Sequence, residues 1–93
     1  MYRVIVTPAA IADVDYLEDW LLKRGADYGL ALGGKLADAS ATLVEYSERT
    51  SLSKDGRYRE LHVTFHSNQY VIQYQVHGDA VVILRIRHSL ERR

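Results

Sequence analysis

The last third of the chain alternates between apolar and polar side chains, and this pattern restricts the fold more than any other feature of the sequence. Residues 59–65 and 70–76 place apolar side chains at every second position, which is typical of strands with one buried face. Residues 66–69 and 77–79 are polar or glycine-containing and predict turns. Residues 80–84 are apolar throughout, which predicts a strand covered on both faces and central in its sheet. We therefore expect three consecutive antiparallel strands followed by a basic tail.

The first residues predict a short strand that leads into a helix. Residues 2–6 alternate around two valines, Thr7 suits an N-cap, and Pro8 suits the first helical position. Apolar residues at helical spacing predict the buried stripe: Ile11, Val14, Leu17 and Leu21. The acidic residues of the same segment are expected on its other faces: Asp13, Asp15, Glu18 and Asp19. A glycine at position 25 ends this helix.

A second helix is predicted from Asp27, as its cap, to about Tyr46. Its expected buried stripe is apolar: Leu32, Leu36, Ala39, Leu43 and Tyr46. Three glycines interrupt this segment at positions 29, 33 and 34, and each costs about 1 kcal/mol of helix propensity relative to alanine. They predict either a close approach between the helices or a mobile first turn.

The order of these elements predicts an α+β fold. An N-terminal strand is followed by a two-helix antiparallel hairpin and then by a three-stranded antiparallel meander, with the helices packed on one face of the sheet. A chain of 93 residues has room for one modest core, so we expect residues 1–93 to form a single domain.

The charge distribution is uneven although the formal net charge is zero. Residues 1–50 hold five Lys/Arg and eight Asp/Glu, a net charge of −3, whereas residues 51–93 hold seven and four, a net charge of +3. A protein that binds nucleic acid mainly through phosphates usually has a clear basic excess, so the neutral total argues against that class. The basic sheet and tail keep a local binding face possible.

Several classes of site and location are disfavoured. The chain has no cysteine, which excludes disulfides and thiolate metal sites and fits a cytoplasmic protein. Asp13 and Asp15 are two residues apart on a helix and do not face one another, so no metal site or cofactor is expected. No apolar run is long enough to span a membrane, and the first residues do not resemble a signal peptide.

The local sequences, in their order along the chain, resemble the ParE/RelE superfamily of small bacterial toxins from type II toxin–antitoxin modules. The matching segments are residues 7–10 (TPAA), 13–17 (DVDYL), 56–61 (GRYREL), 70–76 (YVIQYQV) and 82–90 (VILRIRHSL). No single segment is specific, since tyrosine-rich strands are common, but the ordered set covers nearly the whole chain. The resemblance implies an acidic antitoxin, partly disordered until it binds, as a partner.

Two activities occur in this superfamily. RelE-like members are ribosome-dependent mRNA nucleases, and ParE-like members poison DNA gyrase and have no known catalytic residues. The ending at residues 85–90 resembles the ParE ending more closely, so gyrase is the expected target and the ribosome with its mRNA is the alternative. A third interpretation is an inactive toxin that only binds its antitoxin.

The resemblance, together with the chemistry of each activity, indicates which residues to examine. A metal-independent nuclease needs an acid, a base and cations near the phosphate, and here it would use Arg59, Arg85 and His88. His66 stands where RelE-like nucleases tend to place an arginine. The plainer alternatives are surface charges for the arginines and a hydrogen bond at the end of the sheet for His88.

Binding surfaces are expected at both ends of the sequence. The expected gyrase-binding residues are the basic side chains of the tail: Arg85, Arg87, His88, Arg92 and Arg93. The expected antitoxin contact is Trp20 with Leu21, since a tryptophan there makes the first helix more apolar than one buried stripe requires. The plainer alternative is that Trp20 covers the core.

Overall fold

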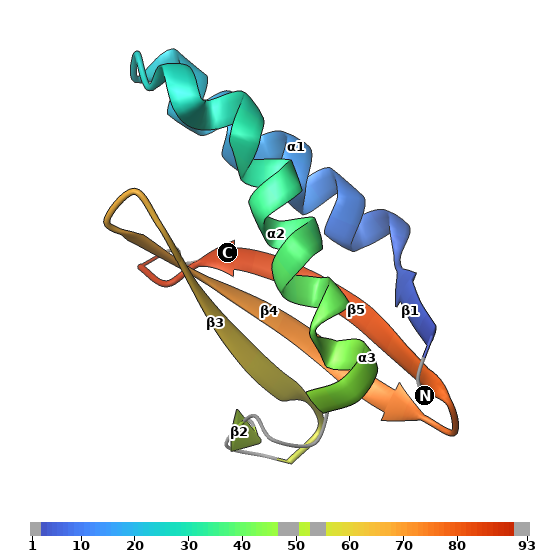
Figure 1. Cartoon of the computed structure of the whole chain (residues 1–93). Coiled ribbons are helices and arrows are strands. Elements are labelled where there is room, and N and C mark those ends of the chain that lie inside the picture. The colour runs from blue at the N-terminus through green and yellow to red at the C-terminus, as the bar shows by residue number, and fades with distance from the viewer. Residues whose placement is uncertain (1–2, 47–50, 53–55, 91–93) are drawn as a thin grey trace.

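The computed structural model describes residues 3–46, 51–52 and 56–90 (Figure 1). Its elements follow the predicted order: β1 (Arg3–Val6), α1 (Pro8–Lys23), the 3₁₀ helix η1 (Asp27–Ala31), α2 (Leu32–Ala41), α3 (Leu43–Tyr46), β2 (Ser51–Leu52), β3 (Arg59–Phe65), β4 (Asn68–His77) and β5 (Ala80–His88). The helices form a hairpin on one face of the sheet (Figure 1). The predicted α+β architecture is confirmed.

The sheet has the strand order β1-β5-β4-β3-β2. β3, β4 and β5 form the predicted antiparallel meander, and β1 is parallel to β5 and pairs with its first half. β5 is an interior strand, as expected, but the prediction that both of its faces are covered was wrong. The helices cover only one face, and Val82 and Leu84 remain half-buried on the other.

A bulge in β5 changes which residues face the core. Tyr74 pairs with Ile83 and Gln73 with Arg85, so Leu84 is an extra residue on β5. Ile83 and Ile86 can therefore both be buried although three positions separate them. The strand continues to His88, which corrects the prediction that it ends at Leu84 and gives way to a tail.

α1 begins as predicted. The Thr7 hydroxyl accepts a hydrogen bond from the Ala10 N–H at 3.2 Å, and it also lies 2.8 Å from the Ile83 carbonyl oxygen, to which it donates. The predicted stripe is only partly correct, because Ile11 is 53% exposed. Leu17 and Leu21 are buried, as predicted. The buried face of α1 also includes Asp13, which the periodicity had placed on another face of the helix.

The second predicted helix is divided into three pieces, η1, α2 and α3. Asp27 is the first residue of η1 and not a cap, and neither η1 nor α2 has a side-chain hydrogen bond from its N-cap residue. α1 compensates for this, because the Glu18 carboxylate accepts the Gly33 N–H at 3.0 Å in the first turn of α2. The side chain of Tyr46 lies outside the described residues.

The core lies between the helix hairpin and the inner face of the sheet. α2 contributes Leu32 and Leu36, and α3 contributes Leu43, as predicted. Ala39 is only partly buried, while Ser40 is buried and donates to the Leu36 carbonyl at 2.8 Å. The sheet contributes buried residues that alternate along β3, β4 and β5: Val63, Tyr70, Ile72, Tyr74, Val81, Ile83 and Ile86.

A buried carboxylate joins α1 to β5. Asp13 is 2% exposed, and its oxygens accept from the Arg85 Nε at 2.8 Å and from an Arg85 terminal nitrogen at 2.9 Å. It also accepts the backbone N–H of Ile86 at 2.9 Å. A carboxylate inside a protein is tolerated only when it is paired and hydrogen-bonded, and both conditions are met here.

We predict that Asp13→Ala lowers the free energy of unfolding by about 3 kcal/mol, because it leaves the Arg85 charge and the Ile86 N–H without their acceptor. Asp15→Ala, on the exposed side of the same helix, should change it by less than about 0.5 kcal/mol. Urea denaturation of both variants measures the difference. Equal effects would show that the Asp13 contact does not hold α1 to the sheet.

Two neighbouring glycines give a second prediction. A Cβ at Gly34 would meet nothing within 4 Å, so Gly34→Ala should stabilise the protein by about 0.5–1 kcal/mol through helix propensity. A Cβ at Gly33 would lie 2.7 Å from the Glu18 carboxylate and displace it from the Gly33 N–H. In Gly33→Ala, the stability gained from helix propensity should be offset by the lost hydrogen bond to Glu18, so the thermal midpoint should stay nearly unchanged. A gain as large as that of Gly34→Ala would argue against the Glu18 cap.

Candidate functional site

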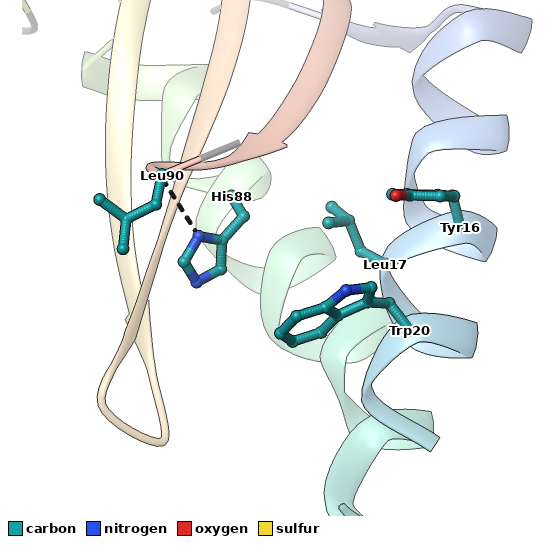
Figure 2. A pocket seen from close by; sticks show the side chains of 5 residues that line it. All are labelled: Tyr16, Leu17, Trp20, His88 and Leu90. Carbon is teal, nitrogen blue, oxygen red and sulfur yellow. Dashed lines mark hydrogen bonds between the residues drawn. The ribbon is translucent and has the colours of Figure 1, made fainter. Parts of the chain in front are cut away.

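An apolar groove lies between the C-terminal half of α1 and the end of β5. Its volume is about 250 Å³, and it is lined by Tyr16, Leu17, Trp20, His88 and Leu90 (Figure 2). Tyr16 is 47%, Trp20 37% and Leu90 83% exposed. Two aromatic residues and a leucine are thus open to solvent at one end of the molecule, and we call this region the terminal groove.

His88 lines the sheet side of the terminal groove, and each of its ring nitrogens forms a hydrogen bond. Nδ1 accepts the Leu90 N–H at 3.1 Å (Figure 2). Nε2 lies 3.1 Å from Oδ1 of Asn68, whose amide group donates to the His66 carbonyl at 3.2 Å. Because Nδ1 is an acceptor, the ring proton is assigned to Nε2, which donates to Asn68. His88 is therefore hydrogen-bonded as a neutral imidazole that fixes the chain after β5.

Aromatic and cationic contacts shape the rest of the terminal groove. The centroid of the Trp20 ring lies 6.2 Å from that of His88, and the Arg24 guanidinium carbon lies 4.1 Å from the Trp20 centroid. Tyr70 packs edge-on to His88 at 5.3 Å. Burial, with a smaller contribution from Tyr28, raises the pKa of Tyr70.

The structure does not bring the three residues of the predicted nuclease set together. Arg59 lies opposite Tyr74 on β4, whereas His88 lies opposite Tyr70. Four residues of strand separate these positions, or about 13 Å at about 3.3 Å per residue. Arg85 points instead into its contact with the buried carboxylate of α1.

His66 occupies the turn between β3 and β4. It has a positive φ of 48°, and the following Ser67 has 66°, which is unusual for residues other than glycine. Its ring stacks on Tyr28 of η1 with a centroid distance of 3.9 Å and an angle of 18°. The turn is thereby held against the helix hairpin.

The predicted target-binding residues divide between described and undescribed parts of the chain. Arg85, Arg87 and His88 lie at the end of β5, and Arg87 is half-buried opposite Val71 on the sheet face that lacks helices. Arg92 and Arg93 lie outside the described residues. Among the described members, His88 alone lines the terminal groove.

The two predicted antitoxin contacts have different surroundings. Trp20 lines the terminal groove and is open to solvent. Leu21 is only 3% exposed and belongs to the core. Its side chain is not available at the surface of this fold.

Sequence reasoning missed three residues that line the terminal groove: Tyr16, Leu17 and Leu90. Tyr16 and Trp20 are four residues apart and therefore neighbours on the helix surface, which is a signal that could have been used. Leu90 follows the last strand and carries no such signal. Within the described ranges, no group of three or more His, Cys, Asp or Glu side chains could hold a metal ion.

None of the helices that the structure describes is long and apolar enough to cross a bilayer.

Comparison with known proteins identifies the family. Residues 4–93 match the model of the ParE toxin of the type II toxin–antitoxin system parDE. Toxin RelE3 of Caulobacter vibrioides is 42% identical over 96 residues that cover all of both chains, and toxin RelE1 of the same organism is 34% identical over 99% of this chain and 98% of its own. A chain of a solved structure, the chromosomal ParDE system from P. aeruginosa, has the same fold, with a TM-score of 0.76, 22% identity and coverage of 95% of this chain and 96% of its own. This chain therefore belongs to the ParE toxin family of type II toxin–antitoxin systems, which makes a cognate antitoxin one of its partners.

Proposed function

We propose that the protein acts in the cytoplasm as an inhibitor of DNA gyrase that binds its target without catalysing a reaction. The observation that carries this proposal is the state of His88, whose two ring nitrogens both serve structural hydrogen bonds. Its toxicity would then be stoichiometric, with gyrase trapped in its DNA-cleaved state until the antitoxin removes the toxin.

The chemistry of RNA cleavage supports this choice. A metal-independent nuclease needs a general base near the 2′-hydroxyl, a general acid near the leaving group and cations on the phosphate. Here both ring nitrogens of the candidate base, His88, are hydrogen-bonded, and Arg85 is held by a carboxylate. Arg59 is two strands away from His88 and offset from it by about 13 Å along the strand direction. Building a catalytic site from these residues would require breaking contacts that hold α1 and the end of β5 in place.

The terminal groove and the basic end of β5 form the proposed surface for gyrase. Tryptophan, tyrosine and arginine are the residues that most often dominate binding energy at protein interfaces. Trp20, Tyr16 and the guanidinium of Arg24 gather around this groove, and Leu90 adds an exposed aliphatic side chain. Arg87 contributes positive charge on the opposite face of the end of β5.

The second candidate is a ribosome-dependent mRNA endonuclease that uses Arg59, Arg85 and His88. The names of the two Caulobacter relatives, RelE3 and RelE1, favour testing it. A toxin that has lost its activity and only binds its antitoxin is the remaining alternative.

The direct test adds purified, antitoxin-free protein to a gyrase supercoiling reaction and, in parallel, to a translating ribosome extract. We expect inhibition of supercoiling with accumulation of cleaved DNA, and intact mRNA. Cuts in the mRNA, abolished by His88→Ala, would overturn the gyrase proposal in favour of the nuclease. No effect in either reaction would favour the inactive binding module.

A matched pair of variants tests the location of the target surface. Leu90 is 83% and Leu30 71% exposed, so Leu90→Asp and Leu30→Asp should leave folding intact. Leu30 lies in η1, outside the terminal groove. We expect Leu90→Asp to weaken gyrase inhibition by about tenfold or more and Leu30→Asp to change it by less than about twofold, as measured by the concentration for half-inhibition. Equal potency of the two variants would place the target surface elsewhere.

A further inference from the structure

A titratable side chain holds the chain that follows β5. The Leu90 backbone N–H donates to Nδ1 of His88 at 3.1 Å (Figure 2). A backbone N–H can only donate, so Nδ1 must carry a lone pair and the ring proton is assigned to Nε2. Nε2 lies 3.1 Å from Oδ1 of Asn68, an acceptor, which agrees with this tautomer. The hydrogen bond to Leu90 therefore requires the uncharged form of the ring.

Two successive amides after β5 are held in different ways. The Ser89 N–H donates to the Gln69 carbonyl at 2.8 Å, and neither backbone group can titrate. The next amide, that of Leu90, depends on His88. The Leu90 side chain lines the terminal groove but is 83% exposed, so packing contributes little to holding it there. The position of this groove wall thus depends on the acceptor that His88 provides.

The acidic groups of α1, the helix across the terminal groove from His88, contact other groups or face solvent. They are arranged as follows: Asp13 binds Arg85, Glu18 accepts the Gly33 N–H, Asp19 binds Lys23 at 2.9 Å, and Asp15 is exposed. The charge that α1 places beside the groove is the guanidinium of Arg24, whose carbon lies 4.1 Å from the Trp20 centroid. Because the His88 centroid lies 6.2 Å from the same tryptophan, a proton on His88 adds a second positive charge there.

The sheet side of the ring presents polar and aromatic groups. Tyr70 of β4 packs edge-on to His88, and burial raises the pKa of Tyr70, which favours its uncharged form. His66 supplies its backbone carbonyl to the Asn68 amide, while its own ring stacks on η1. Arg87, one position before His88, lies on the opposite face of β5. The hydrogen bond to Leu90 is therefore the contact that proton uptake by His88 changes most directly.

We infer that His88 is a pH-sensitive switch that sets the shape of the terminal groove. Uptake of a proton at Nδ1 converts the acceptor of the Leu90 N–H into a donor, so this hydrogen bond breaks and two N–H groups face one another. Nε2 keeps its hydrogen bond to Asn68, so the ring stays on the sheet while Leu90 leaves the groove. Histidine is the side chain that ordinarily changes charge between about pH 5 and pH 8.

The direction of the pH dependence follows from the proton count. The arrangement with Leu90 in the terminal groove carries one proton on the His88 ring, and the released arrangement carries two. The groove is therefore formed at the alkaline end of the histidine range and is lost as the pH falls. The consequence for the target, weaker inhibition of gyrase in acid, rests on the proposed function, whereas the switch itself is a property of the free protein.

Nuclear magnetic resonance of the free protein tests the switch without a target. The ¹⁵N shifts of the His88 ring should show the Nε2–H tautomer at about pH 8 and the imidazolium at about pH 5.5. Corrected for the intrinsic effect of pH, exchange of the Leu90 amide should become about five- to tenfold faster over this range, the factor expected for one lost hydrogen bond. Exchange of the Ser89 amide is the internal reference and should change by less than about twofold.

Three results would overturn the inference. They are a His88 ring that stays neutral throughout, a Leu90 amide whose protection does not change when His88 titrates, and equal changes at Leu90 and Ser89. The last result would show that the whole end of β5 frays in acid.

Two histidine variants identify the group responsible. Asparagine at position 88 can accept the Leu90 N–H as in an Asx-turn but cannot take up a proton. Trp20 is the single tryptophan of the chain, so the fluorescence of the protein reports on the terminal groove. We expect tryptophan emission to change with pH in the unsubstituted protein and in His77→Asn, whose exposed histidine lies outside the groove, and to stay constant in His88→Asn. An equal pH response in His88→Asn would assign the titration to another group and overturn the inference.

Gyrase inhibition at two pH values connects the switch to the target. The concentration for half-inhibition should be about threefold or more higher at about pH 6.5 than at about pH 8 for the unsubstituted protein and for His77→Asn. For His88→Asn the same ratio should stay below about 1.5, which also corrects for the effect of pH on gyrase itself. Equal ratios in all three proteins would contradict a role of the switch in target binding. If the unsubstituted protein does not inhibit gyrase at either pH, the proposed target fails, while the measurements on the free protein still decide the switch.

Discussion

The buried carboxylate of Asp13 determines how the two halves of this molecule fit together. β1 covers one side of β5 only as far as Ile83, and beyond that point the strand needs another partner for its outward backbone groups. Where β1 ends, the Thr7 hydroxyl donates to the carbonyl oxygens of Ile83 and Leu84. Further along β5, the Asp13 carboxylate accepts the N–H of Ile86. α1 thereby replaces a strand along the second half of β5.

This substitution of a helix for a strand creates the terminal groove. Where α1 lies against the end of β5, Trp20 and Leu17 face His88 and leave the terminal groove. Breaking the contact between Asp13 and β5 would release α1, and the terminal groove would change with it.

The sequence allowed the local features to be predicted, and the long-range ones were missed. Alternation identified β3 and β4, and Thr7 with Pro8 identified the start of α1, because each signal lies within a few residues. The role of Asp13 depends on an arginine 72 positions away, so helical periodicity alone assigned it to solvent. The bulge at Leu84 likewise depends on the partner strand, which keeps Tyr74 opposite Ile83 and shifts the residues that follow.

The candidate sites were predicted only in part for the same reason. A tryptophan on a surface helix and a histidine after a strand were both visible in the sequence. That Trp20 and His88 face one another across a groove follows from the packing of α1 on β5, which no short pattern encodes. The two ring nitrogens of His88 form hydrogen bonds with the Asn68 side chain and the Leu90 backbone N–H. These contacts match the plainer alternative for His88, a hydrogen bond at the end of the sheet, and they favour a structural role over that of a general base.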